Sequence, residues 1–194
     1  MNKQLKKVLA TGLIVVGIGF VSRAQAATSD TMNVLVTPGN PSYGVTITSV
    51  TVGQGYNFGA VNLGSSTGST QAVGVLNSGN VSEYFVMFIS TSSGGSANWK
   101  PAGSAGGASV DIFELYGRFY ASGSTIPGNA AFVGTDFIAG ANGTNGANTY
   151  NQATTKTNGG VSKDLWMKLQ MPTGMSLSDS AQRTMVLTIT GQGT

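Results

Sequence analysis

The chain contains neither cysteine nor histidine. Without cysteine there are no disulfide bonds and no thiolate metal sites. Without histidine there is no Ser-His-Asp or Cys-His catalytic arrangement and no histidine-ligated zinc. Charged residues are also scarce, at 9% of the 194 residues. We therefore expect no catalytic residues, no metal and no cofactor, and we predict that the protein is not an enzyme.

The remaining catalytic options find little support in the sequence. A Ser–Lys pair needs a buried lysine, but the lysines of the globular part lie in predicted loops or on an outward strand face. Paired carboxylates would have to come from Glu83, Glu114 and five aspartates, and Asp111 and Glu114 point to opposite faces of their predicted strand. The many glycines form no strand–Gly-x-Gly-x-x-Gly–helix unit, so we interpret them as turn residues rather than as a phosphate site.

The N-terminus has the pattern of a secretory signal. Lys3, Lys6 and Lys7 precede the apolar run Val8–Phe20, and Ala24-Gln25-Ala26 is a small-residue cleavage site. The apolar run is short for a membrane span, which needs ~20 residues. We predict a cleaved signal peptide over residues 1–26, with an uncleaved N-terminal anchor as the alternative. The protein is then secreted, extracellular or on the cell surface, and the periplasm remains open.

Cleavage after Ala26 would change the charge of the chain. The whole sequence has ten basic and seven acidic residues. Lys3, Lys6, Lys7 and Arg23 would leave with the signal, so the acidic residues would outnumber the basic ones by one. The basic excess therefore belongs to the predicted signal. We expect no nucleic-acid partner, no polybasic membrane patch and no membrane span after cleavage.

The apolar residues of the remaining chain occur in short runs between Gly, Pro, Asn and Ser turns. This pattern predicts an all-β fold, with one β-sandwich domain over residues 27–194 and about eight or nine mostly antiparallel strands. Long Gly-rich loops are expected at 91–108 and 139–160. The predicted strands are Thr31–Thr37, Gly44–Val52, Phe58–Leu63, Gln71–Asn77, Glu83–Ser90, Val110–Ala121, Ala130–Ile138, Asp164–Met171 and Arg183–Thr190.

Two of these strands break simple alternation. In Gly44–Val52 the apolar residues change face near Ser49, which predicts a bulge and a strand that switches between sheets. Glu83–Ser90 is apolar on both faces. It is therefore expected to be central and covered on both sides, or to contact something on its second face.

Two parts of the sequence resemble a known family of domains. The run Phe58–Gly64 reads Phe-Gly-x-Val-x-x-Gly, and a strand then leads to Asn77-Ser78-Gly79-Asn80. This resembles bacterial immunoglobulin-like domains, including ASH/hydin-type and surface-anchored β-sandwich modules. Leu165–Leu169, with the stretch Thr184–Thr190, looks like the last two strands of such modules. The resemblance implies an immunoglobulin-like sandwich with a binding or structural role outside the cytoplasm, and it does not extend to Thr91–Gly160.

The candidate binding residues are aromatic. Tyr116 and Tyr120 flank Arg118 on the outward face of the longest predicted strand, Trp166 points outward from its own strand, and Trp99 lies in a Gly-rich loop. Aromatics presented in this way stack on sugar rings or anchor a protein partner. The alternative is that Tyr116, Tyr120 and Trp166 pack beneath the long loops, which often cover sandwich faces.

These observations predict an exported cell-surface or extracellular protein with a structural or adhesive role. A carbohydrate-binding module that uses the outward aromatics is the alternative. The partners expected are other surface proteins, glycans or a second copy of the chain. Self-association is plausible because Met32–Thr37, set off by a Pro/Gly break, has the pattern of a strand that pairs in trans with an exposed sheet edge.

Overall fold

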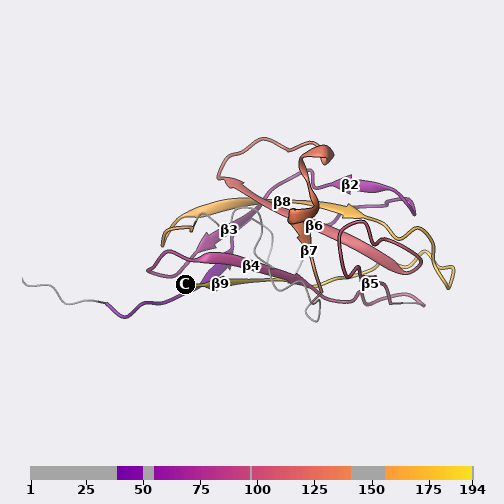
Figure 1. Ribbon diagram of the computed structural model, residues 1–194, viewed down its shortest axis with the longest axis horizontal. Coiled ribbons are helices and arrows are strands. Elements are labelled where there is room, and N and C mark those ends of the chain that lie inside the picture. Colours follow the sequence, from indigo (N-terminus) through magenta and orange to yellow (C-terminus); the bar gives the residue numbers. More distant parts are fainter. Residues whose placement is uncertain (1–38, 50–54, 97, 141–155, 194) are drawn as a thin grey trace, which may run out of the picture. The chain divides into compact units, whose positions relative to one another are not determined.

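A computed structural model describes residues 39–49, 55–96, 98–140 and 156–193 (Figure 1). Residues from Asn40 onward form one compact unit. The predicted signal peptide and the predicted strand Thr31–Thr37 lie outside the described residues. The strands are β1 (Val45–Ile47), β2 (Ser66–Gly68), β3 (Val73–Asn77), β4 (Tyr84–Ile89), β5 (Lys100–Pro101), β6 (Ile112–Ala121), β7 (Phe137–Ile138), β8 (Ser162–Gln170) and β9 (Leu187–Gln192), with short 3-10 helices η1 (Asn129–Ala131) and η2 (Gly134–Asp136).

The strands form two sheets, which confirms the all-β prediction. The larger sheet has seven strands in the order β1-β3-β8-β6-β5, with β2 also paired to β8 and β7 paired to β6. The smaller sheet consists of β4 and β9. All strand pairs are antiparallel except β5–β6. The longest pairing, between β6 and β8, runs through the middle of the larger sheet.

The main core lies between the two sheets. Alternate residues of β8 and β6 face alternate residues of β4, as the period of two in these strands predicts. This alternation confirms the predicted inward positions of β6 and β8. The buried members are Val73, Val75, Phe85, Met87, Ile89, Trp99, Phe113, Leu115, Phe119, Ile138, Leu165, Met167, Leu169 and Met171.

A second apolar cluster lies on the opposite face of the larger sheet. Tyr116 from β6 and Trp166 from β8 pack there against Phe132 and Phe137. The last two belong to the segment 122–139, which carries η1 and η2 and passes over the middle strands (Figure 1). Both faces of the β6–β8 pair are therefore covered.

The predicted strand Phe58–Leu63 is wrong. Residues 55–62 form no strand, and Leu63 and Gly64 form a turn. Gly59 and Gly64 have φ of 73° and 72°, a left-handed conformation that interrupts an extended chain. The side chain of Phe58 still packs against the main core. The strand in this region is β2, which is not among the predicted strands.

The predicted strand Ala130–Ile138 is also mostly wrong, because only Phe137 and Ile138 are extended and paired. Ala130 and Ala131 belong to η1 and Gly134–Asp136 form η2, while Phe132 and Val133 between them are extended but unpaired. Asp136 closes the second of these turns by accepting the backbone N–H of Val133 at 2.9 Å. This capping bond competes with the backbone hydrogen bonds that a strand would form with its neighbour, and it favours the helical turn.

The structure corrects the position of Glu83–Ser90. Its strand, β4, belongs to the two-stranded sheet rather than to a central position in a wide one. One face is buried in the main core, while the side chains of Tyr84, Val86 and Phe88 are half-buried. On the second face the Lys156 ammonium lies 5.4 Å from the centre of the Tyr84 ring.

The predicted break near Ser49 corresponds to the end of β1. The strand stops at Ile47, and Ser49 forms a bend. Its hydroxyl accepts the backbone N–H of Gly74 and so continues the contact with β3. Residues 50–54 lie outside the described residues, and the switch between sheets stays a prediction.

Candidate functional site

The structure buries three of the four predicted binding aromatics. The exposed fractions are 7% for Tyr116, 4% for Trp166 and 6% for Trp99. Tyr116 and Trp166 pack against Phe132 and Phe137 of the segment 122–139, whereas the alternative stated above had placed them beneath the loops 91–108 and 139–160. Trp99 does lie outside the predicted strands, but it belongs to the main core. A large aromatic ring gains more from such burial than from exposure to water, because burial removes its apolar area from solvent.

Arg118 and Tyr120 keep partial exposure on the same face. The Arg118 guanidinium lies 5.3 Å from the centre of the Tyr120 ring. It also donates to the carbonyl of Ala131 at 2.6 Å and lies 3.7 Å from the buried carboxylate of Asp136. Arg118 therefore fastens the η1–η2 segment to β6. The five predicted site residues do not form one open surface.

Tyr116 is part of a buried polar contact. Its hydroxyl donates to Glu114 Oε2 at 2.7 Å, and Glu114 Oε1 accepts the N–H of Ala108 at 2.9 Å. Burial, followed by the hydrogen bond to the Glu114 carboxylate, raises the pKa of Tyr116 to about 12. The Lys168 ammonium lies 4.2 Å from the centre of its ring. Tyr116 is thus a neutral hydrogen-bond donor to Glu114, and the Glu114 carboxylate in turn holds Ala108 of the 91–108 loop.

Trp166 satisfies its indole N–H inside the molecule, as buried indoles usually do. Nε1 donates to the hydroxyl of Ser124 at 2.8 Å. Asp164, on the same strand, accepts the N–H groups of Gly123 and Ser124 at 2.8 and 3.1 Å. The turn after β6 is therefore held by two side chains of β8, and Trp166 serves packing and loop attachment.

The same use of carboxylates recurs across the described residues. Six of them accept a backbone N–H from a loop or turn, bonds that are stronger than those between neutral groups. The pairs are Glu83 with Gly44, Asp111 with Ser176, Glu114 with Ala108, Asp136 with Val133, Asp164 with Gly123 and Ser124, and Asp179 with Ser96 and Ala181. Sequence reasoning did not find this role, because Glu83, Asp111, Asp164 and Asp179 bond to segments distant in sequence.

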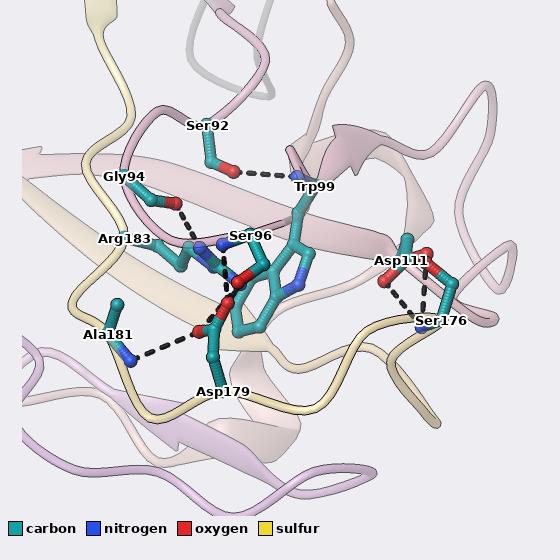
Figure 2. A network of polar contacts seen from close by, with 9 residues as sticks. All are labelled: Ser92, Gly94, Ser96, Trp99, Asp111, Ser176, Asp179, Ala181 and Arg183. Carbon is teal, nitrogen blue, oxygen red and sulfur yellow. Dashed lines mark hydrogen bonds and ion pairs between the residues drawn. The ribbon is translucent and has the colours of Figure 1, made fainter.

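The most extensive of these contacts joins two loops (Figure 2). Asp179 accepts the N–H groups of Ser96 and Ala181 and forms an ion pair with Arg183 at 3.0 Å. The backbone hydrogen bond from Ser96 is the main reason that the pKa of Asp179 falls to about 2. The carboxylate is therefore ionised at neutral pH and links the loop before β5 to the segment before β9.

Trp99 lies next to this ion pair. The Arg183 guanidinium lies 5.2 Å from the centre of its ring and donates to the carbonyl of Gly94, while Ser92 Oγ accepts the Trp99 backbone N–H at 2.7 Å (Figure 2). A guanidinium over an indole ring is an attractive contact. Trp99 thus anchors its loop to the core from within, which explains its burial.

Glu83 lies at the junction of both sheets. It is fully buried, and Oε2 accepts the N–H of Gly44 at 3.1 Å. Gly191 of β9 packs directly on the carboxylate and leaves no room for a side chain there. Burial is the main cause that raises the pKa of Glu83. The end of β9 and the start of the described chain therefore meet at one carboxylate.

The outer edge of β9 is the clearest candidate for an interaction surface. β9 pairs with β4 alone. No hydrogen bond to another described segment reaches Leu187, Ile189 or Gly191 on the other edge. The sequence predicted a donor strand that needs an exposed edge, but it did not identify the edge. The patterns of β4 and β9 cannot show which strand ends a sheet, because this depends on the order of strands.

The described residues offer neither a metal site nor a helix that could cross a membrane. They contain no group of three or more carboxylate side chains placed to hold a metal ion. They also contain no helix with the length and apolar character that a membrane crossing requires.

The chain was compared with protein-family models, with curated proteins and with solved structures, and none of the three comparisons found a match. The likeness to immunoglobulin-like domains therefore stays a prediction from the sequence.

Proposed function

We propose that this chain is an exported β-sandwich of immunoglobulin-like type with a structural or adhesive role at the cell surface or outside the cell, and that it acts without catalysis. The observation that carries the proposal is the use of its carboxylates. Each of the six in the described residues accepts a loop N–H. Charge in this protein fastens loops to sheets, which suits a rigid scaffold.

The aromatic residues support the same proposal. Trp99, Tyr116 and Trp166 are buried. Trp99 anchors its loop in the main core, Trp166 bonds to Ser124 in the turn after β6, and Tyr116 bonds to Glu114, which holds Ala108. A glycan-binding platform needs exposed rings, and on this face only Tyr120 keeps partial exposure beside Arg118. The structural role therefore has more support than the carbohydrate-binding alternative. A glycan array with the unmodified protein and Tyr120→Ala tests that alternative directly.

Cell fractionation tests the proposed function. Producing cells are separated into culture medium, material sheared from the surface, periplasm and cytoplasm, and the N-terminus of the purified chain is determined by mass spectrometry. The proposal expects the chain in the sheared or extracellular fraction with Ala27 as its first residue. Recovery in the cytoplasm with residues 1–26 attached would contradict it.

A further inference from the structure

We propose that β9 accepts the segment Thr31–Thr37 of a second copy of this chain as an additional antiparallel strand. The inference rests on the proposed structural function and names the partner and the surface through which copies join. Five observations carry it: the free backbone groups of β9, its half-covered apolar side chains, its unprotected sequence, the pattern of Thr31–Thr37, and the place where the described chain begins.

The first observation is the direction of the backbone groups of β9. In an antiparallel pair, hydrogen-bonded and non-hydrogen-bonded residue pairs alternate. Ile89 of β4 donates its N–H away from β9, to the carbonyl of Ala139. Its partner Leu187 is therefore in a non-hydrogen-bonded pair, and so are Ile189 and Gly191. The N–H and C=O groups of these three residues point to the open edge, where an added strand would find them.

The second observation is the incomplete cover of the core at this edge. Leu187 and Ile189 face the main core, yet both are only half-buried. Their partners on β4, Ile89 and Met87, are 2% and 0% exposed. The difference arises because no other described strand pairs with β9 on its far side. A further strand would bring apolar side chains against Leu187 and Ile189.

The third observation is that the sequence of β9 does not protect this edge. Natural edge strands are kept apart by lysine, proline, bulges or shortness. β9 is six residues long and reads Leu-Thr-Ile-Thr-Gly-Gln. It contains no charge and no proline. Such an edge is a template for strand addition.

The fourth observation is the sequence of the segment that would pair with β9. Thr31–Thr37 reads Thr-Met-Asn-Val-Leu-Val-Thr, carries no charge and is rich in residues that favour strands. Met32, Val34 and Val36 share one face because side chains alternate along a strand. Seven residues suffice to pair with the whole of β9. The Pro38–Pro41 turn residues then separate the segment from the described domain.

The fifth observation decides between a second copy and the same copy. Residues near the start of the described chain lie beside the end of β9: Gly44 and Gly191 contact the same carboxylate, and Gly193 lies against Tyr43. A segment that leads into this point runs in the same direction as β9 if it lies along its own β9. It would pair in parallel, which is the weaker arrangement. The segment of another copy is free to pair antiparallel.

The donor segment and the acceptor edge are different surfaces, so the contact is heterologous. Contacts of this type build rings when the rotation closes and open chains when it does not. A symmetric pair through one shared patch is not expected. Each copy accepts one strand and donates one.

Disulfide trapping tests the inference, because the chain has no cysteine of its own. The full chain is expressed with its own leader, purified from the fraction in which it accumulates and oxidised mildly. One variant combines Val34→Cys with Ile189→Cys, and a second combines Val34→Cys with Leu187→Cys. Val34→Cys with Ser104→Cys, in an exposed loop, is the matched control, as are the four single variants.

The inference expects a ladder of covalent multimers on a non-reducing gel for at least one of the first two variants, and loss of the ladder on reduction. The Ser104 control is expected to give none. A disulfide within a single chain would overturn the inference and show that the segment pairs with β9 of its own chain. If neither variant forms a disulfide, the proposal that the edge of β9 accepts this segment is overturned. A monomeric protein that is still found at the cell surface would remove this inference and leave the proposed function standing.

Discussion

At the scale of single residues, Glu83 carries the most informative titration. Its carboxylate is fully buried, its Oε1 atom has no hydrogen-bond partner, and burial raises its pKa above the ordinary value of 4.5. The folded protein therefore holds the Glu83 proton more tightly than the unfolded chain does. Stability from this group is fully present below pH 4.5 and is lost as the pH rises through the folded pKa.

Glu83→Gln removes this titration and keeps an acceptor for the Gly44 N–H. We expect the free energy of unfolding of the unmodified protein, relative to Glu83→Gln, to fall as the pH rises above 4.5. Urea unfolding at a series of pH values measures it. A difference that rises with pH would contradict the account of Glu83.

The pKa of Asp179 is shifted in the opposite direction to that of Glu83. Its pKa is lowered to about 2 from 3.8, chiefly by the backbone hydrogen bond from Ser96. Its contribution is fully present above pH 3.8 and is lost as the pH falls toward 2. We expect Asp179→Asn to be less stable than the unmodified protein at pH 7 and equally stable near pH 2. Thermal unfolding at both pH values measures this, and a deficit that persists at the lower pH would show that the ionised carboxylate is not the cause.

At the scale of elements, the second apolar cluster separates a structural role from a binding role for the predicted aromatics. Trp166→Ala removes a ring that is 4% exposed and leaves a cavity beneath the segment 122–139. We expect a loss of about 3–5 kcal/mol in the free energy of unfolding. Tyr120→Ala, on the same face but half-buried, is the control and should cost less. Equal, small losses would indicate that Trp166 is not packed as described.

Gly117 tests the packing between the two sheets. It lies in the middle of β6, and a Cβ atom there would lie 2.9 Å from both the Ile138 Cδ1 and the Met87 Cε atoms. Gly117→Val therefore overfills the main core, and we expect it to cost roughly 1–3 kcal/mol of stability. Gly103→Val, at a loop position where nothing lies within 4 Å of a Cβ, should change stability little. Chemical unfolding of both variants measures the contrast.

The elements also show what sequence patterns reveal. The alternation in β6 and β8 predicted their faces correctly, because a strand with a regular period of two has one buried side in any sheet. The prediction that β4 is a central strand was wrong, because the two apolar faces of a strand do not indicate how many strands lie beside it. Phe58–Leu63 and Ala130–Ile138 were wrong because local turn geometry at Gly59, Gly64 and Asp136 prevailed over apolar content.

The candidate site was less predictable than the fold. The residue types of Trp99, Tyr116 and Trp166 suited both a binding surface and a buried cluster. Their surroundings are decided by the segment 122–139 and by the loop that carries Trp99, whose attachments involve partners such as Ser124 and Arg183. Contacts over such separations leave no periodic signal in a single sequence.

At the scale of the whole molecule, the open edge of β9 and the segment Thr31–Thr37 make the chain both acceptor and donor. Deleting Thr31–Thr37 removes the donor and leaves the described domain unchanged. Leu35→Asp changes the face of the segment opposite Met32, Val34 and Val36, and Val34→Asp changes the core-facing side. In the proposed pairing Val34 lies against Leu187 and Ile189, which are only half-buried. A charge placed against these apolar side chains is costly, so Val34→Asp should weaken association more than Leu35→Asp does.

The mass of the purified full chain in solution, measured by light scattering across a range of concentrations, tests self-association through the edge of β9 most directly. The account predicts that the mass of the unmodified protein rises above that of one chain as concentration increases, and that the Thr31–Thr37 deletion stays at the mass of one chain throughout. Identical masses for the two proteins at every concentration would contradict it.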